Sequence, residues 1–317
     1  MQKIKNTLKF SLLSILLTTL FSLTWPVMSH GQTLKSGIFT TTQGTKLFAA
    51  SHILNPNQPT LILLPGIYRG YLPDEAILKS LTQRGHNWVS LHLSRHPESV
   101  LGGSTFVTGL ATSKELASEV VQVKRALQIK KPILVSLSYS GTLSPFWNRQ
   151  EFPVLIETSP MGRHDESKQT IPALEAWQQW MNLFPVWGPL VVQTNEFWGY
   201  RGYWLQKTEE LTQTHPRYNS LKIKIAEGLA QLAWATRGFD IRTQDFSKGP
   251  ERFWILGANE LPVRLRYQLE AVEIHKRITG QSNRLFLIQN AGHIVPGDQL
   301  ELYIQALEKV LKRARFQ

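Results

Sequence analysis

The chain has 317 residues, of which 42% are hydrophobic and 18% are charged, and its formal net charge is +12. This length allows one large domain with an insertion, and the composition excludes a disordered protein. The basic residues are scattered and no nucleic-acid motif occurs, so the positive charge is interpreted as solvated surface and no nucleic-acid partner is expected. Because cysteine is absent, disulfides and thiolate metal sites are excluded.

The N-terminal segment has the layout of a secretory signal. Three lysines in the first nine residues precede an uncharged apolar run, and Pro26 and a small-residue pattern follow that run. We therefore expect residues 1–31 to be a signal peptide, cleaved after Gly31, and the mature protein to be periplasmic or secreted in a bacterial envelope. Membrane contact is expected only through this signal. The alternative is an uncleaved anchor, for which the apolar run is short.

The mature chain begins with a segment typical of a β-hairpin and then alternates between strand and helix patterns. Residues 37–53 contain two strand patterns with no helix between them, which predicts an antiparallel hairpin. The apolar runs 60–66 and 87–93 predict strands, and residues 73–85 predict a helix between them that ends at a glycine.

The same alternation continues toward the C-terminus. Residues 112–129 predict an amphipathic helix with Ser113 as its N-cap. Four further apolar runs predict strands: residues 131–138, 152–159, 252–258 and 284–290. Strands that alternate with helices predict an α/β fold with a mainly parallel sheet covered on both faces.

One long segment interrupts this alternation. Between Ser159 and Pro250 the sequence has helical patterns but no strand pattern of the core type. Six tryptophans fall there, namely Trp177, Trp180, Trp187, Trp198, Trp204 and Trp234. We expect residues 160–249 to form a helical cap inserted into a core made of residues 32–159 and 250–317. The alternative is a helical layer on one side of the sheet that takes no part in a site.

A serine cluster follows the strand at 131–138. A strand that turns sharply into a helix can present a nucleophilic serine in a strained conformation, and the residues two before and two after it must then be small. Ser138 fits this pattern, with Ser136 and Ser140 as small neighbours and Gly141 easing the packing of the helix. If Ser140 were the nucleophile, one neighbour would be the β-branched Thr142, which fits less well.

A nucleophilic serine needs a base, and the base needs an acid that orients it. His293 follows the last predicted strand, and Glu260 lies in the turn after the preceding strand. The chain order Ser138, Glu260, His293 is the order known for such triads. Glu157, at the end of the strand after the serine turn, is the alternative acid. An oxyanion would be bound by the N–H groups of Ile67 and Tyr139.

These motifs together resemble an α/β-hydrolase of the esterase, lipase and peptidase-like group. LLPG, VSLSYSG, LGANELPV and NAGHIVP correspond to the oxyanion turn, nucleophile elbow, acid turn and histidine loop of that family. Three features depart from its usual pattern: Pro65 stands where histidine is frequent, serines replace the elbow glycines, and the acid is Glu where Asp is commoner. In this family an insertion at the place of the predicted cap is usually a lid.

The resemblance implies a serine hydrolase that needs no metal or organic cofactor, and the signal pattern at residues 1–31 implies that it is exported. A carboxylic ester is the expected substrate, either a small molecule or one with a lipid-like acyl chain, and the sequence leaves the oligomeric state open. Two alternatives remain: a non-catalytic binding protein that kept the fold, and an aminopeptidase acting on small peptides.

Overall fold

The computed structural model describes residues 35–42, 44–67, 75–104, 111–163, 188–282 and 284–314. The predicted signal peptide, residues 1–31, lies outside these ranges. Within them, one eight-stranded sheet has the strand order β1-β2-β4-β3-β5-β6-β7-β8. The strands are β1 Lys35–Thr40, β2 Lys46–His52, β3 Thr60–Leu64, β4 Asn87–His92, β5 Pro132–Leu137, β6 Val154–Thr158, β7 Glu251–Gly257 and β8 Leu285–Ile288.

The sheet is mainly parallel. β1 and β2 form the predicted antiparallel hairpin, and β2 pairs antiparallel with β4. The remaining neighbours, from β4 through β3, β5, β6 and β7 to β8, all pair in parallel. Parallel strands end at the same edge of a sheet, so the loops after β5, β7 and β8 gather at one carboxyl edge. The predicted α/β fold with a mainly parallel sheet is therefore confirmed.

The strands are apolar throughout because both faces of the sheet are covered. Every residue of β3, β4, β5 and β6 is buried. Alternate side chains enter opposite clusters: Leu61 and Leu63 pack with Ile77 and Leu81 on one face, whereas Ile62 and Leu64 belong to the cluster on the other face.

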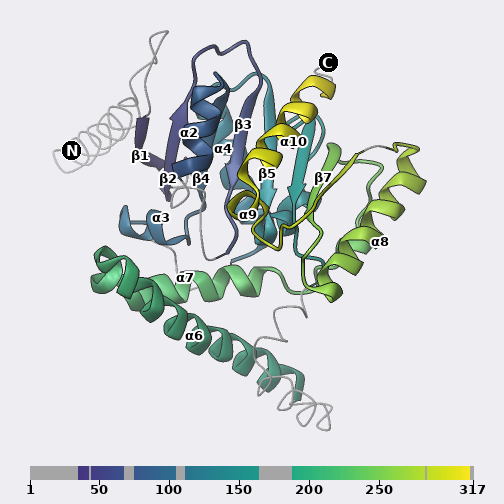
Figure 1. Ribbon diagram of the computed structural model, residues 1–317. Coiled ribbons are helices and arrows are strands. Elements are labelled where there is room, and N and C mark those ends of the chain that lie inside the picture. The colour runs from purple at the N-terminus through teal and green to yellow at the C-terminus, as the bar shows by residue number, and fades with distance from the viewer. Residues whose placement is uncertain are drawn as a thin grey trace, which may run out of the picture.

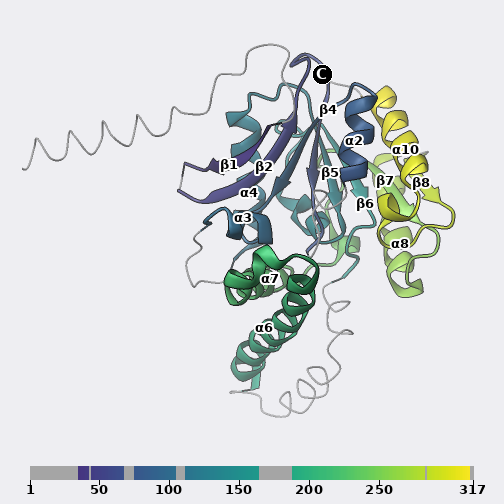
Figure 2. The same cartoon turned by 60° about the vertical axis from the view of Figure 1, so that its left-hand side comes forward.

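Helices form the outer layers. α2 (Glu75–Gln83) and α10 (Leu300–Arg313) lie together on one face, and α4 (Ser113–Ala126) covers the other (Figures 1 and 2). Two short helices, α3 (Pro97–Leu101) and α9 (Val295–Asp298), follow the ends of β4 and β8. α8 (Pro262–Thr279) packs beside β7 and ends at Gly280, whose φ of 69° is the left-handed conformation typical of a helix C-terminus.

The N-cap predicted for α4 is wrong by one residue. Thr112, not Ser113, is the N-cap: its side chain accepts a hydrogen bond from the N–H of Glu115, and the Glu115 carboxylate accepts one from the N–H of Thr112. This reciprocal capping box satisfies two backbone donors that a helix start leaves unpaired. The Ser113 hydroxyl instead donates to the carbonyl oxygen of Ala235, at 2.6 Å.

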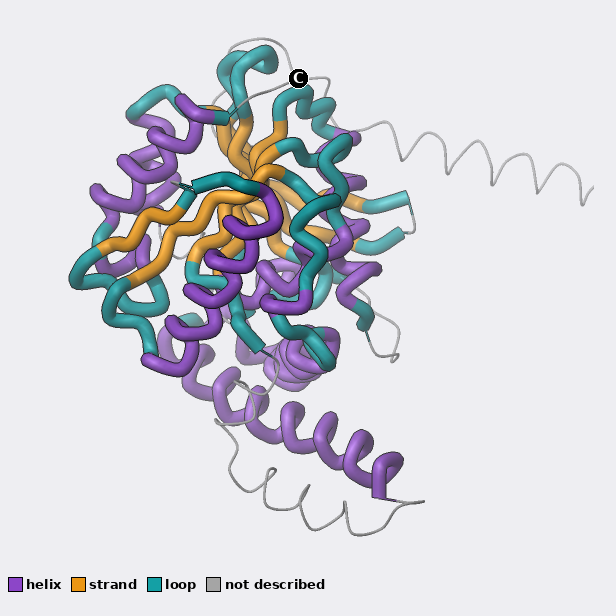
Figure 3. Tube along the Cα trace, turned by 90° about the vertical axis from the view of Figure 1, so that its right-hand side faces the viewer, coloured by secondary structure: helices purple, strands orange, loops and turns teal. Residues whose placement is uncertain are grey.

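Between β6 and β7 the described residues contain helices and a single isolated bridge, but no strand. The helices are α6 Gly188–Thr214, η4 Pro216–Leu221, α7 Lys222–Ala235 and η5 Ile241–Thr243. α7 lies across one end of the sheet, with α6 packed against its outer side (Figures 1 and 3). Of the predicted cap tryptophans, Trp177, Trp180 and Trp187 and the side chain of Trp198 lie outside the described residues.

Side-chain hydrogen bonds place α7 and η4 at the carboxyl edge of the sheet. Arg95, in the loop after β4, donates from Nε to Oε1 of Gln231 in α7 at 2.9 Å. The Tyr218 hydroxyl of η4 donates to the Glu98 carboxylate of α3 at 2.7 Å. The second carboxylate oxygen of Glu98 lies 3.0 Å from Nδ1 of the buried His92. The helices between β6 and β7 are therefore bound to the edge where parallel strands end.

The helical layer shares the apolar cluster that covers one face of the sheet, because Ile62 and Leu64 of β3 belong to the same cluster. Trp204 of α6 is 8% exposed and joins the cluster that also contains Leu229 and Leu232 of α7. Its ring meets the Tyr203 ring edge to face, with centroids 5.1 Å apart. Over the described ranges, none of the helices combines the length and the apolarity that a membrane crossing requires.

Candidate active site

The chain turns sharply at Ser138, where β5 ends and the short helix η1 (Ser138–Phe146) begins. Ser138 has a φ of 54°, a left-handed conformation that non-glycine residues rarely adopt. Its carbonyl oxygen accepts a hydrogen bond from the N–H of Met161 at 3.0 Å, which fixes the turn from outside. The chain therefore makes a strained turn at the carboxyl edge, at the residue predicted to be the nucleophile.

The close approach at this turn explains Gly141. A Cβ added there would lie 2.8 Å from Cβ of Pro160 and 2.9 Å from Oε2 of Glu157. These separations are too short for a side chain, so glycine is required where the helix passes the segment after β6.

Ser136 and Ser140 are small, as predicted, but their hydroxyls are also bonded. Ser136 donates to Oε2 of Glu157 at 2.6 Å. The Ser140 oxygen accepts from the N–H of Leu137 at 2.8 Å and lies 3.2 Å from the carbonyl oxygen of Leu64, at the end of β3. The two neighbours of Ser138 therefore tie the turn to the strands on either side of β5.

The three side chains predicted as a triad meet in one hydrogen-bonded chain. Oγ of Ser138 lies 2.7 Å from Nε2 of His293, and Nδ1 of His293 lies 2.5 Å from Oε2 of Glu260. A carboxylate only accepts, so Nδ1 carries the proton of a neutral ring and Nε2 is left to accept from the Ser138 hydroxyl. This is the arrangement in which a histidine can take a proton from serine.

Glu260 is held on both carboxylate oxygens. Its side chain is 1% exposed, and Oε1 accepts from the N–H of Leu261 at 3.0 Å. Burial favours the neutral carboxyl, but the hydrogen bond and charge of His293 outweigh burial and, with the Leu261 N–H and Arg264, lower the pKa of Glu260 below its ordinary value. Glu260 is therefore ionised where it faces the histidine.

The acid turn and the histidine loop, residues 289–294, are bonded to each other through their backbones. The N–H of Ala258 donates to the carbonyl of Ile288 at 2.9 Å, and that of Asn259 donates to the carbonyl of Ala291 at 2.8 Å. A Cβ on Gly257 would overlap the carbonyl oxygens of this loop. Glycine at the end of β7 thus allows the two loops to approach closely enough for Glu260 to reach His293.

Glu157, the alternative acid, is engaged elsewhere. Its Oε1 lies 2.9 Å from Nη1 of Arg252, and both side chains are almost completely buried, at 0% and 2% exposed. Burial raises the pKa of Glu157, although the Arg252 guanidinium opposes this effect, and burial also lowers the pKa of Arg252. Both oxygens of Glu157 have partners below the serine turn, whereas the histidine contacts Glu260.

The two predicted oxyanion donors occupy neighbouring strand ends. Tyr139 is the second residue of η1, where backbone N–H groups have no partner within the helix. Ile67 lies in the turn after β3, the neighbour of β5 in the sheet, and the N–H of Ile67 has no acceptor among the described residues. Both donors therefore lie beside the strand end that carries Ser138.

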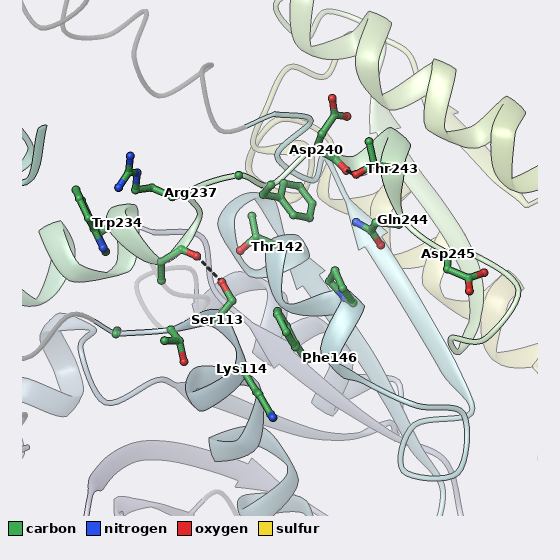
Figure 4. A pocket seen from close by; sticks show the side chains of 16 residues that line it. Ser113, Lys114, Thr142, Phe146, Trp234, Arg237, Asp240, Thr243, Gln244 and Asp245 are labelled. Atoms are coloured by element: carbon green, nitrogen blue, oxygen red, sulfur yellow. Dashed lines mark hydrogen bonds between the residues drawn. The ribbon is translucent and has the colours of Figure 1, made fainter. Parts of the chain in front are cut away.

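A cavity of about 700 Å³ opens between the core and α7 (Figure 4). It is lined by the start of α4, by Thr142 and Phe146 of η1, and by Trp234 of α7 with the segment that follows it. Ser138 and His293 are not among its lining residues. Across the described ranges no group of three or more His, Asp or Glu side chains is arranged to hold a metal ion.

No family model and no curated protein matches the chain. Solved structures do match. An esterase from Exiguobacterium antarcticum has a TM-score of 0.59 at 16% identity, over 88% of this chain and 100% of that chain. A thermophilic esterase from Thermogutta terrifontis has a TM-score of 0.56 at 19% identity, over 89% and 100% of the two chains. MGS-M2, an alpha/beta hydrolase enzyme from a deep-sea metagenome library, has a TM-score of 0.60 at 13% identity, over 89% and 99%.

At these identities the likeness concerns the fold and not the chemistry. The matches extend over 88–89% of the chain, and the sheet has the strand order and the mainly parallel pairing described above. The chain therefore has the α/β-hydrolase fold that its motifs predicted.

Proposed function

We propose that the protein is a serine hydrolase that cleaves carboxylic esters through an acyl-enzyme. The observation that carries this proposal is the continuous hydrogen-bonded chain from Ser138 through His293 to Glu260, with separations of 2.7 and 2.5 Å. It lies at the carboxyl edge of the sheet, where α/β folds place their active sites. Several solved structures with this fold are described as esterases, which favours esters over other acyl substrates.

In the proposed reaction, the Ser138 oxygen attacks the ester carbonyl while Nε2 of His293 takes the hydroxyl proton. The negative charge that develops on the carbonyl oxygen is bound by the N–H groups of Ile67 and Tyr139. His293 then gives its proton to the departing alcohol, which leaves the acyl group on Ser138. Water, deprotonated by the same ring, attacks the acyl-enzyme. The bond between the acyl carbon and the Ser138 oxygen then breaks, the ring returns the proton to that oxygen, and the carboxylic acid leaves. Glu260 keeps the ring in the required tautomer and stabilises its charged form.

The helices bound across the carboxyl edge support a role in substrate choice. We propose that residues 160–249 act as a cap that covers the site and accepts a small or lipid-like acyl chain. The support is the position of α7 over the edge, held by the Arg95–Gln231 and Tyr218–Glu98 hydrogen bonds. Export of the mature chain after cleavage at Gly31 is part of the same proposal, and N-terminal sequencing of the protein from a periplasmic fraction tests it.

Labelling with a fluorophosphonate, followed by mass mapping, tests the proposed chemistry. We expect one modified residue, Ser138, and hydrolysis of short p-nitrophenyl esters by the unmodified protein. Ser138→Ala should abolish both while the protein stays folded, because loss of the nucleophile typically costs several orders of magnitude in rate.

Ser140→Ala is the matched control, since it removes a hydroxyl two residues away. It should keep the label and most of the turnover. A folded wild-type protein that neither takes the label nor cleaves any ester would be a binding protein with a hydrolase fold. Release of N-terminal residues from small peptides, without ester cleavage, would point to an aminopeptidase.

A further inference from the structure

A buried histidine outside the proposed triad lies beside the oxyanion turn. His96 follows β4 and is the N-cap residue of α3, and it is 1% exposed. The proposed mechanism assigns it no role. Both of its ring nitrogens nevertheless have backbone partners, at 3.1 Å each: the N–H of Leu93 and the carbonyl oxygen of Gly66.

These two partners define the proton position on the ring. A backbone N–H can only donate, so Nδ1 of His96 accepts from Leu93. A carbonyl oxygen can only accept, so Nε2 carries the proton and donates to Gly66. Burial, with the nearby His92, lowers the pKa of His96 to about 3, which keeps the ring neutral and able to make both bonds.

The bond to Gly66 acts on the proposed oxyanion donor directly. The carbonyl of Gly66 and the N–H of Ile67 belong to the same peptide unit, which is planar and trans. In such a unit the C=O and N–H point in opposite directions. A hydrogen bond that holds the Gly66 oxygen toward His96 therefore holds the Ile67 N–H on the opposite side.

The same ring also contacts the residue that supplies the second donor. The rings of His96 and Tyr139 meet edge to face, with centroids 6.5 Å apart and planes at 75°. The Tyr139 side chain is completely buried, so it fixes its own backbone at the start of η1. One imidazole thus packs against the side chain of Tyr139 and bonds the peptide that contains the N–H of Ile67.

We propose that His96 is a positioning residue of the oxyanion hole, which orients the Ile67 N–H through its hydrogen bond to the Gly66 carbonyl. This inference rests on the proposed function. His96 touches neither the substrate nor Ser138, and it acts by holding a donor in place before the reaction begins. A buried histidine with only a structural role would affect stability and leave the turnover of folded protein unchanged.

Three substitutions separate these two roles. His96→Gln offers an amide N–H at the distance of Nε2 and can still donate to Gly66. His96→Asn offers an acceptor at the distance of Nδ1 for the Leu93 N–H but does not reach Gly66. His96→Phe keeps the shape of the ring and loses both bonds. His275→Phe is the matched control, because His275 is also buried, at 2% exposed, but lies against Phe246 and Trp254, away from the site.

The measurements are kcat and KM for a p-nitrophenyl ester, the inhibition constant of a trifluoromethyl ketone, and Tm, all on the full mature chain. Deleting an oxyanion donor costs about 100- to 1,000-fold in kcat, and a displaced donor costs less. We expect His96→Asn and His96→Phe to lower kcat about 10- to 100-fold with KM nearly unchanged. The ketone forms an oxyanion with Ser138, so its inhibition constant should rise by a similar factor in both variants. His96→Gln should recover most of both losses, and His275→Phe should change Tm alone.

Two results would overturn the inference while the proposed function stands. In the first, the wild-type protein is active and takes the label, and the His96→Asn and His96→Phe variants keep its full kcat and its affinity for the ketone. The other is a His96→Gln variant that loses as much kcat as His96→Phe. If His96→Phe does not fold, the comparison between the Asn and Gln variants decides. An inactive and unlabelled wild type would overturn the proposed function and this inference together.

Discussion

Glu260 and Glu157 undergo the same chemical change when each is replaced by Gln, yet the structure predicts opposite consequences. In Glu260→Gln, the amide oxygen can still accept the hydrogen bond from the Leu261 N–H, which has a length of 3.0 Å to Oε1 in the wild type. The amide nitrogen then faces Nδ1 of His293, where the carboxylate oxygen lay 2.5 Å away. Because two N–H groups cannot share that position, the ring must take the other tautomer, with its proton on Nε2.

A ring protonated on Nε2 cannot accept the proton of Ser138. We therefore expect Glu260→Gln to lower kcat by roughly 10³- to 10⁴-fold, as tautomer errors in serine hydrolases do. The shape of the side chain is kept, so Tm should change little. The loss also includes the missing carboxylate charge that stabilises the imidazolium form of His293.

Glu157→Gln should instead act on stability. Arg252 is 2% exposed and would lose its ionic partner, and breaking a buried ion pair costs about 3–5 kcal/mol. Gln keeps one oxygen for the guanidinium, so the lower end, about 3 kcal/mol, is expected. At about 2 °C per kcal/mol for a chain of this size, Tm falls by about 6 °C. The kcat per folded molecule should stay within about threefold of the wild type.

The assay is turnover of a short p-nitrophenyl ester at saturating substrate, corrected for the folded fraction, together with thermal unfolding followed by circular dichroism. The reasoning is refuted if Glu157→Gln loses turnover per folded molecule while Glu260→Gln keeps it. It is also refuted if Glu260→Gln loses activity only in proportion to lost folded protein.

Three further predictions concern the loops and the cap. Gly257→Ala should lower kcat/KM about 100-fold, because the added Cβ would push the histidine loop away. The fluorophosphonate should also react with Ser138 correspondingly slowly. An unchanged kcat/KM would contradict the close approach of the two loops. Burial favours a neutral Glu98, but His92 and Tyr218 lower its pKa from 4.5 to about 2. Its stabilisation is therefore complete above about pH 4.5 and lost as the pH falls toward 2, so the wild-type Tm should fall more steeply over that window than the Tm of Glu98→Gln. Trp204→Ala should destabilise the fold by about 3–5 kcal/mol without changing the preference among acyl chain lengths, and a changed preference at full stability would place Trp204 in the acyl pocket.

The sequence was sufficient for the features that depend on local pattern. Strands buried on both faces are continuous apolar runs, so those at residues 132–137 and 154–158 lie inside the predicted ranges, and the strand at 251–257 begins one residue before the predicted range 252–258. The candidate site could be predicted for a related reason. In a parallel sheet, residues that follow strand ends must gather at one edge, whatever their separation along the chain.

Features that depend on contacts between distant segments were not predictable in the same way. His96 follows a strand like many loop residues, and no spacing in the sequence marks its contact with Gly66. Ser136 and Ser140 were explained by size alone, because their partners Glu157 and Leu64 become neighbours only in the folded sheet. The N-cap of α4 differs in this respect, because the spacing of Thr112 and Glu115 is itself a capping-box signal in the sequence.

The hydrogen bond between Ser136 and Glu157 limits which substitutions these positions can accept during evolution. A glycine at position 136, the commoner residue in such turns, would leave Oε2 of Glu157 without the hydroxyl that now donates to it at 2.6 Å. Substitution of Glu157 alone would leave the buried Arg252 guanidinium without its ionic partner. A single substitution at Ser136, Glu157 or Arg252 is therefore unfavourable. Replacing Ser136 by glycine and both Glu157 and Arg252 by apolar residues would leave no buried polar group of the three unpaired. Among descendants of a common ancestor, positions 136, 157 and 252 should consequently co-vary as one inherited unit.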